Sequence, residues 1–251
     1  MFVLFIIEHF RKHENRMLLM ENIRQDEILK ILKKRGNVSV KELSSELFVS
    51  EMTVRRDLAE LEKCGFLTRY RGGAACKTKG SDYPINIRCK FCEKGKRELA
   101  VSAAKHIRDD SLVFLDSSTI STYIVMHISE KNNVRIVTNS VYIALIAAQF
   151  HIPCDLVGGK YDEKDMCLVG NVAIRQLSEI NPDIAFISSS SLSDDGIISD
   201  GNEQQTEVRR AAIKNAKKRV FLFDSAKLHR VDTFNLCRVS KSDIVITEQE
   251  V

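Results

Sequence analysis

Four arginines are spaced for binding an anionic polymer in the stretch VSEMTVRRDLAELEKCGFLTRYRGG, residues 49–73. Arg55 and Arg56 are adjacent in a charged segment, whereas Arg69 and Arg71 alternate with other residues ahead of two glycines. A guanidinium group donates paired hydrogen bonds to phosphate oxygens and to the edges of DNA bases. The four arginines could therefore bind DNA if the fold places them on one surface.

Three short helices are predicted before and within this stretch. Apolar residues at helical spacing mark a first helix over 23–35 and a third over 51–63, with a short second helix between them. Ser39 and Ser50 are suitable N-caps for the second and third helices. A brief turn joins the last two helices, which predicts a helix-turn-helix whose third helix enters the major groove of DNA.

The third helix is expected to keep a polar face free. Its apolar residues recur at positions 54, 58 and 61, so Thr53, Arg55 and Arg56 fall outside the buried stripe or at its margin. The alternative is a solvated helix whose arginines pair with nearby acidic residues, namely Glu51, Asp57 and Glu60. The ordered succession of helix, turn, helix and basic hairpin favours the DNA-binding interpretation.

A hairpin is predicted directly after the third helix. Gly65 ends the helix, the segment FLTRYR alternates in polarity, and a double glycine follows at 72–73. This pattern is typical of the wing of a winged helix, which would place Arg69 and Arg71 along the DNA backbone. The candidate DNA-binding residues are Ser39, Ser50, Thr53, Arg55, Arg56, Arg69 and Arg71.

From about residue 92 onward, short apolar runs alternate with helical segments. The predicted strands are SLVFLD, VRIVTN, CDLVGG, DIAFISS, RVFLFD and DIVITE, and the helices between them cover about 118–129, 140–150, 168–179 and 203–218. Such alternation predicts a largely parallel sheet covered on both faces. The predicted fold class is therefore α/β, with a winged helix-turn-helix domain at 21–76 and a mainly parallel α/β domain at 92–251.

Polar residues gather where four of these strands end. Ser117, Ser118 and Thr119 open a helix after the first strand, where hydroxyls and free N–H groups bind a phosphate. The segments TNS at 138–140 and GGK at 158–160 follow the next two strands, and DSAK ends the fifth strand with Lys227 as a cation. Ligands bind at the carboxyl ends of parallel strands, so these groups predict one anion site.

The sequence resembles the DeoR family of bacterial transcriptional regulators over about residues 21–251. The DNA-binding half carries the family pattern VS..T.RRDL..LE..G.L.R..GGA almost unbroken, and LDSSTIS, VTNS, VGG and DSAK are similar to the family's sensor patterns. The resemblance implies a sensor that resembles ribose-5-phosphate and glucosamine-6-phosphate isomerases in fold and binds a phosphorylated sugar. The residues it implies for the effector are Asp116, Ser117, Ser118, Thr119, Thr138, Asn139, Ser140, Gly158, Gly159, Glu207, Arg209 and Lys227.

Within that set the resemblance implies distinct roles. Residues 116–119 and Lys227 would hold the phosphate, and Asn139 and Gly159 would lie near the sugar. Glu207 and Arg209 belong to TEVRRAAI, which is similar to the family segment E..VKRAMI, and would lie at the rim of the pocket.

The sensor half also departs from the family pattern. Ser118 stands where the family has glycine, Ile120 replaces a threonine, and SSSSLSDDG replaces a turn that usually contains glycine. The Ser118 side chain is expected to occupy space where the backbone would approach a phosphate. We therefore expect a pocket that is tuned to another ligand or weakened.

Composition narrows the remaining possibilities. The net charge is only +4 over 251 residues, so positive charge for a nucleic acid must be local. Seven irregularly spaced cysteines fit a reducing cytoplasm, and the single CKFC at 89–92 is expected to hold two incidental thiols, without metal or cofactor. The apolar run at 2–7 is too short to span a bilayer, so no membrane association is expected; residues 1–20 fit a frayed helix or an N-terminal extension.

These observations predict a DNA-binding transcriptional regulator, most often a repressor in this family, whose partners are double-stranded operator DNA and a phosphorylated sugar. Because paired half-sites require paired readers, a homodimer or homotetramer is expected. One alternative is a DNA-binding protein whose second domain is only an oligomerisation scaffold. Another is a sugar-phosphate isomerase, for which Asp116 and Glu207 are the available carboxylates, without a pair of histidines to accompany them.

Overall fold

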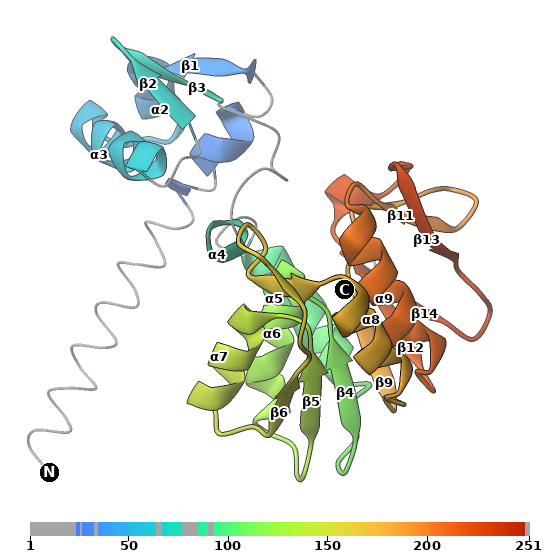
Figure 1. The fold of residues 1–251 in the computed structure, drawn as a ribbon. Helices are drawn as coiled ribbons and strands as arrows, with labels where there is room; N and C mark the ends of the chain where they lie inside the picture. Colours follow the sequence, from blue (N-terminus) through green and yellow to red (C-terminus); the bar gives the residue numbers. More distant parts are fainter. Residues whose placement is uncertain are drawn as a thin grey trace, which may run out of the picture. The chain divides into compact units, whose positions relative to one another are not determined.

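The N-terminal part of the chain folds around the apolar stripes of its short helices. The computed structural model describes residues 24–25, 27–32, 35–63, 67–76, 85–89 and 93–248. The chain divides into two units, Met1–Tyr83 and Pro84–Val251 (Figure 1). In the first unit the described residues of 24–35 are helical. They are followed by β1 (Asn37–Ser39), α2 (Val40–Glu46), α3 (Glu51–Lys63), β2 (Leu67–Tyr70) and β3 (Gly73–Cys76).

This unit is a winged helix-turn-helix. The predicted stripe of α3 is buried at Val54, Leu58 and Leu61, and Ile28 and Leu43 of the preceding helices are buried as well. The wing is the antiparallel hairpin of β2 and β3, and β1 adds a third strand in the order β1-β3-β2. The strand β1 was not predicted, because a three-residue strand has no periodicity to detect.

The double glycine of the wing has a steric cause. A Cβ atom on Gly73 would lie 2.5 Å from the carbonyl oxygen of Val38 and 2.6 Å from the Tyr70 hydroxyl. Only glycine lets β3 approach β1 this closely. The turn is tied to α2 as well, since the Val40 N–H donates to the Gly72 carbonyl at 2.8 Å. The wing is therefore held against the helices.

The second unit is built on a six-stranded parallel sheet in the order β14-β12-β9-β4-β5-β6. Its strands are the six predicted ones: β4 (Leu112–Leu115), β5 (Arg135–Thr138), β6 (Cys154–Leu156), β9 (Ile184–Ile187), β12 (Arg219–Phe223) and β14 (Ile244–Thr247). The helices are α4 (Ile85–Arg88), α5 (Glu93–Ala104), α6 (Thr119–Ile128), α7 (Val141–Gln149), α8 (Asn171–Ser178) and α9 (Glu203–Lys214).

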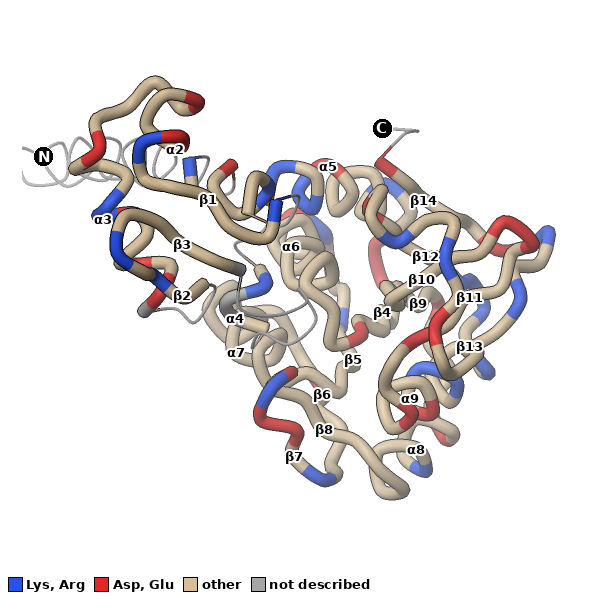
Figure 2. The backbone as a smooth tube through the Cα atoms, turned by 90° about the horizontal axis from the view of Figure 1, so that it is seen from above, with Lys and Arg blue, Asp and Glu red and all other residues tan. Residues whose placement is uncertain are grey.

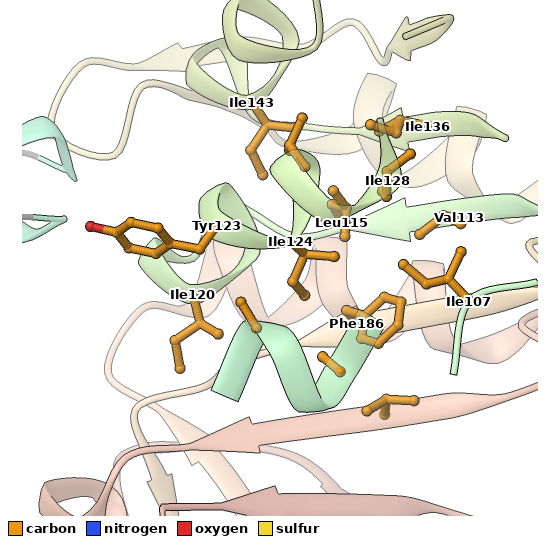
Figure 3. Packing of buried hydrophobic residues seen from close by; sticks show 14 of the residues in the cluster. Ile107, Val113, Leu115, Ile120, Tyr123, Ile124, Ile128, Ile136, Ile143 and Phe186 are labelled. Carbon is orange, nitrogen blue, oxygen red and sulfur yellow. The ribbon is translucent and has the colours of Figure 1, made fainter. Parts of the chain in front are cut away.

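Helices cover both faces of this sheet, which explains why its strands are continuously apolar. Alternate residues of each strand enter two separate cores. Val113 and Leu115 pack with α5, α6 and α7 (Figure 3), whereas Phe114 packs with α8 and α9. Phe186 and Ala185 divide β9 between the two cores in the same way. The mainly parallel α/β architecture expected from the sequence is thus present.

Several smaller elements differ from the predictions. The helix expected over 168–179 begins only at Asn171, because 167–169 form β8 (Cys167–Val169), which pairs with β7 (Lys160–Asp162). The helix expected over 203–218 ends at Lys214. A second, antiparallel sheet of β10 (Ser191–Leu192), β11 (Ile197–Asp200) and β13 (Phe234–Arg238) was not predicted, and neither was α4. Among the described residues, no helix is both long and apolar enough to cross a membrane.

Candidate functional site

The first candidate site is a basic groove between α3 and the wing. It is a hollow of about 320 Å³ lined by Val40, Arg55, Leu58, Arg69, Tyr70, Arg71, Gly72 and Gly73. Three of these side chains are cationic and none is acidic. Figure 2 colours the basic residues of α3 and of the β2–β3 turn blue. The fold thus brings Arg55 of α3 together with Arg69 and Arg71 of the wing around one hollow.

The arginines of the groove are paired only at the surface. Arg55 donates to Glu51 at 3.1 Å, and the N–H and Nε of Arg69 donate to the Glu62 carboxylate at 2.8 and 2.6 Å. Both pairs are about half exposed, so each adds at most about 1 kcal/mol to stability. A phosphate can therefore replace the carboxylates at little cost.

The other two carboxylates considered as partners of the arginines bind elsewhere. Asp57 is 1% exposed and accepts two hydrogen bonds from Arg24 of the first helix, at 2.5 and 2.9 Å. Glu60 accepts a hydrogen bond from Gln25. These contacts fasten α3 to the first helix and leave Arg55 and Arg56 on the exposed face.

The hydroxyl residues of the predicted DNA-binding set cap the helices. Ser50 Oγ accepts from the Thr53 N–H at 3.1 Å and bonds to the Thr53 hydroxyl at 2.9 Å. Ser39 and Glu42 form a capping box at the start of α2, and the hydrogen bonds from Ser39 lower the pKa of the Glu42 carboxyl. Ser39 also lines a second hollow, where Arg35 and Lys41 stand beside Glu42 and Glu46. Charge of both signs there makes it less suited to DNA than the basic groove.

In the second unit, Asp116 is the centre of the predicted phosphate loop. One carboxylate oxygen accepts from the Ser118 N–H at 3.2 Å and the Ser121 hydroxyl at 2.7 Å. The other accepts from the Ser188 N–H at 3.0 Å and from Arg209 Nε at 2.9 Å. Four donors saturate the carboxylate, so Asp116 orders the loop and has no lone pair left for a general base.

Arg209 is a buried connector rather than a residue of the rim. Its side chain is 7% exposed and also donates to Asp200 at 2.7 Å and to Gln205 at 3.0 Å. Burial alone disfavours the cation, but Asp200 and Asp116 outweigh burial and raise the pKa of Arg209. Burial alone would likewise raise the pKa of Asp200, yet Arg209 and several hydrogen-bond donors hold it below the ordinary value of 3.8.

Lys227 reaches the same place from the short 3-10 turn that follows β12. Its Nζ donates to the Ser188 hydroxyl at 2.9 Å, and the Asp224 carboxylate lies 3.8 Å away. Since the Ser188 N–H binds Asp116, Ser188 links Lys227 to the loop after β4. The ends of three neighbouring strands, β12, β9 and β4, therefore meet here. The sequence predicted Lys227 and residues 116–119 to converge, but it missed Ser188 between them.

Ser118 does not behave as its substitution for glycine led us to expect. Its φ of −86° is ordinary extended backbone that any residue adopts, and its side chain turns back to cap α6. Ser118 Oγ accepts from the Ser121 N–H at 3.2 Å and donates to the Ser121 hydroxyl at 2.9 Å. The amides of Thr119 and Ile120, in the first turn of α6, have no intrahelical acceptor and stay suited to an anion.

The TNS segment after β5 is bonded within the protein. Thr138 donates to the Leu115 carbonyl, Asn139 to the Leu168 carbonyl, and Ser140 caps α7. All three residues are at most 2% exposed. The structure thus gives these three residues a role in joining β4, β5 and β8.

Gly158, Gly159 and Glu207 also lie apart from the Asp116 network. The Gly158 N–H donates to the Gln176 side chain, and a Cβ atom on Gly159 would lie 2.7 Å from the Val169 carbonyl oxygen. The close approach predicted at Gly159 is therefore to β8 of the protein itself. Glu207 is half-buried and pairs with exposed Arg210, on another side of α9 from buried Arg209.

Six further residues of the network were not predicted from the sequence: Arg88, Asp165, Ser189, Ser190, Asp200 and Gln205. Gln205 accepts from Ser117 at 3.1 Å and from Arg209, and it donates to Asp165, which also pairs with Arg88 of α4. Asp200 binds Ser189 and Ser190 besides Arg209. The polar run SSSSLSDDG was the available signal for part of this network.

The CKFC motif contributes one described thiol. Cys89 is buried, which raises its thiol pKa, and its Sγ lies 3.5 Å from the Thr122 hydroxyl. Cys92 lies outside the described residues. Within the described parts of the chain, no group of three or more metal-ligating side chains is found.

Comparisons with known proteins match the two units of the chain to two different domain families. Residues 24–79 match the model of the DeoR-like helix-turn-helix domain, and residues 92–249 match that of the DeoR C-terminal sensor domain. The chain is 31% identical over 231 residues to a lactose phosphotransferase system repressor of Staphylococcus epidermidis, covering 90% of this chain and 91% of that protein. It is 28% identical over 228 residues to the glycerol-3-phosphate regulon repressor of Escherichia coli, covering 90% of each.

Among solved structures, ribose 5-phosphate isomerase A from Methanocaldococcus jannaschii is similar at 20% identity and a TM-score of 0.41, over 54% of each chain. A similarity at this level says nothing about activity. The two family matches together cover most of the chain, and they fall on the winged helix and on the α/β unit. The protein therefore belongs to the DeoR family of transcriptional regulators.

Proposed function

We propose that the protein represses an operon for carbohydrate use and that a phosphorylated sugar controls its binding to the operator. The names of the relatives support this proposal, because they include a glycerol-3-phosphate regulon repressor and a lactose phosphotransferase system repressor. The observation that carries it is the chain of contacts from Lys227 through Ser188 to Asp116, which gathers three strand ends beside the first turn of α6. We place the domains at 21–76 and 92–251.

In the DNA-bound state, Arg55 and Arg56 would contact base edges from the start of α3. Arg69 and Arg71 would bind phosphates from the wing, after Glu62 releases Arg69. Ser39, Ser50 and Thr53 lie at helix N-termini, where their N–H groups and hydroxyls suit backbone phosphates. Because a two-fold operator needs two readers, the active form would be a homodimer or homotetramer, and it would act in the cytoplasm.

In the sensor, the phosphate of the effector would lie between Lys227 and the amides of Thr119 and Ile120. Ser117 and Ser118 would line the same loop, and Asp116 with Arg209 would keep it in place. The remaining residues of the implied set, Thr138, Asn139, Ser140, Gly158, Gly159 and Glu207, would act at a distance by shaping the neighbouring loops. The saturated Asp116 carboxylate supports a binding site without isomerase activity.

A second candidate function is a DNA-binding protein whose α/β unit serves only for oligomerisation. The observation that favours it is the burial of Thr138, Asn139 and Ser140, whose hydrogen-bonding groups face the protein. In that case the polar residues at the strand ends would only stabilise the fold and would bind no ligand.

The test begins with the purified full-length protein and operator duplexes selected from a random pool. Glycerol 3-phosphate, glucose 6-phosphate, fructose 1-phosphate and ribose 5-phosphate are added in turn, with inorganic phosphate and the unphosphorylated sugars as controls. We expect at least one sugar phosphate to raise the melting temperature and to change operator affinity. Operator binding that ignores every sugar phosphate would favour the scaffold, and release of a converted sugar would favour an isomerase.

A further inference from the structure

The exposed face of α3 combines an apolar side chain with two arginines. Met52, Arg55 and Arg56 are spaced i, i+3 and i+4, so they lie on one face of the helix. Met52 is 76% exposed, and it stands one residue inside the N-terminus, which is where a recognition helix meets base edges. The buried stripe that begins at Val54 faces the other way.

The chemistry of this face matches one feature of the major groove. Phosphates and guanine edges bind arginines, whereas the C5-methyl group of thymine is the apolar group that the groove presents. A methionine side chain is flexible and polarisable, so it can pack against a methyl group at variable angles. The flanking arginines, together with Arg69 and Arg71 in the adjoining groove, make the surroundings complementary to DNA rather than to an apolar protein surface.

We propose that Met52 is a specificity-determining residue that packs against a thymine methyl group of the operator. The proposal rests on the DNA-binding function proposed above and adds the base that the apolar contact selects. Met52 makes no contribution to the buried core, so its replacement changes the contact with DNA and leaves the fold intact.

Phe48 provides a matched control within the same unit. Its side chain is apolar like that of Met52, and it is 94% exposed and so at least as accessible. It lies in the turn between α2 and α3 with a φ of 54°, outside the helical face that carries Arg55 and Arg56. An effect of general surface hydrophobicity would appear in Phe48→Ala as well as in Met52→Ala.

The experiment replaces each thymine of a selected operator, one at a time, by deoxyuridine, which removes only the methyl group. For the wild-type full-length protein we expect about a fourfold loss of affinity at one thymine per half-site, equivalent to about 0.8 kcal/mol for one buried methyl-sized group. Met52→Ala should bind the thymine duplex about fourfold more weakly and should not distinguish uracil from thymine there. Met52→Leu and Phe48→Ala should keep the sensitivity.

Three outcomes would overturn the inference. Equal losses on uracil substitution in wild type and Met52→Ala would assign methyl recognition to another residue. Indifference of the wild-type protein to every uracil would exclude methyl recognition altogether. Failure to select any duplex would overturn the proposed DNA binding, and the role of Met52 with it.

Discussion

Arginines meet carboxylates in both halves of the molecule, but in opposite settings. In the winged helix, Arg55 and Arg69 pair with Glu51 and Glu62 at the surface. In the sensor, Arg209 lies between Asp116 and Asp200 with all three side chains at most 10% exposed. The first arrangement keeps cations available to a partner, whereas the second commits its cation to the protein.

The difference separates groups that bind from groups that position. An exposed ion pair is worth at most about 1 kcal/mol and exchanges readily for a phosphate. A buried pair leaves an uncompensated charge when one partner is removed, which costs about 3–5 kcal/mol. Hence the winged helix keeps the arginines proposed to bind DNA at its surface. The sensor uses its buried charges to hold the loops on which Lys227 and the first amides of α6 are carried.

The largest effect is expected for the arginines of the recognition helix. The double substitution Arg55→Ala, Arg56→Ala removes contacts worth about 1–3 kcal/mol each, so it should abolish specific operator binding. Stability should change by less than about 0.5 kcal/mol, because both side chains are exposed. Gel shifts at several salt concentrations measure the affinity, with Lys30→Ala on the first helix as the control. If the double variant bound the operator as tightly as wild type, the assignment of α3 as the recognition helix would be wrong.

For Arg209→Ala we expect the opposite, namely a large loss of stability from a residue that does not contact DNA. Loss of the buried cation should lower the free energy of unfolding by about 3–5 kcal/mol, since Asp116 and Asp200 would stay buried without it. Urea denaturation followed by circular dichroism measures the change, and Arg69→Ala in the wing is the exposed control. If both variants lost the same stability, the contrast between the two settings would not hold.

Acid should affect the sensor through Asp200. Folding lowers the pKa of Asp200, so the stability from its charged form is present above the ordinary pKa of 3.8 and is lost as pH falls through the lowered value. We expect a declining unfolding free energy below about pH 4. Asp200→Asn should be less stable at pH 7 and should lose less on acidification. A variant with the acid response of wild type would assign that response to other carboxylates.

The smallest effect is expected for Ser118→Gly. Replacing this N-cap by glycine should cost only a few tenths of a kcal/mol. The change frees the Ser121 N–H, which Ser118 Oγ now occupies, and so adds an amide donor at the start of α6. Sugar-phosphate binding measured by calorimetry should tighten. Weaker binding would mean that the serine hydroxyl itself contacts the ligand.

The sequence predicted those parts of the fold that local pattern determines. Each strand of the six-stranded sheet is a run buried on both faces, and each major helix has its own cap or breaker, as at Ser39, Ser50 and Ser118. The strand β10 was missed because it has only two residues, and β11 and β13 were missed because they pair with each other across more than thirty residues. The candidate effector site likewise combines residues found in local motifs with contacts between residues far apart in the sequence. Lys227 and residues 116–119 belong to local motifs, whereas Ser188 binds Asp116 across 72 residues, and Arg209 does so across 93.

The central claim is that an anion held by Lys227 in the sensor controls operator binding in the winged helix. The most direct measurement is the anisotropy of a labelled operator duplex during titration with the sugar phosphate, for wild type and Lys227→Ala. Both proteins should bind the operator equally without effector. The variant should then need roughly tenfold to a hundredfold more effector for the same response, because it lacks a charge-assisted hydrogen bond worth about 1.5–3 kcal/mol. Identical effector titrations for the two proteins would contradict the account.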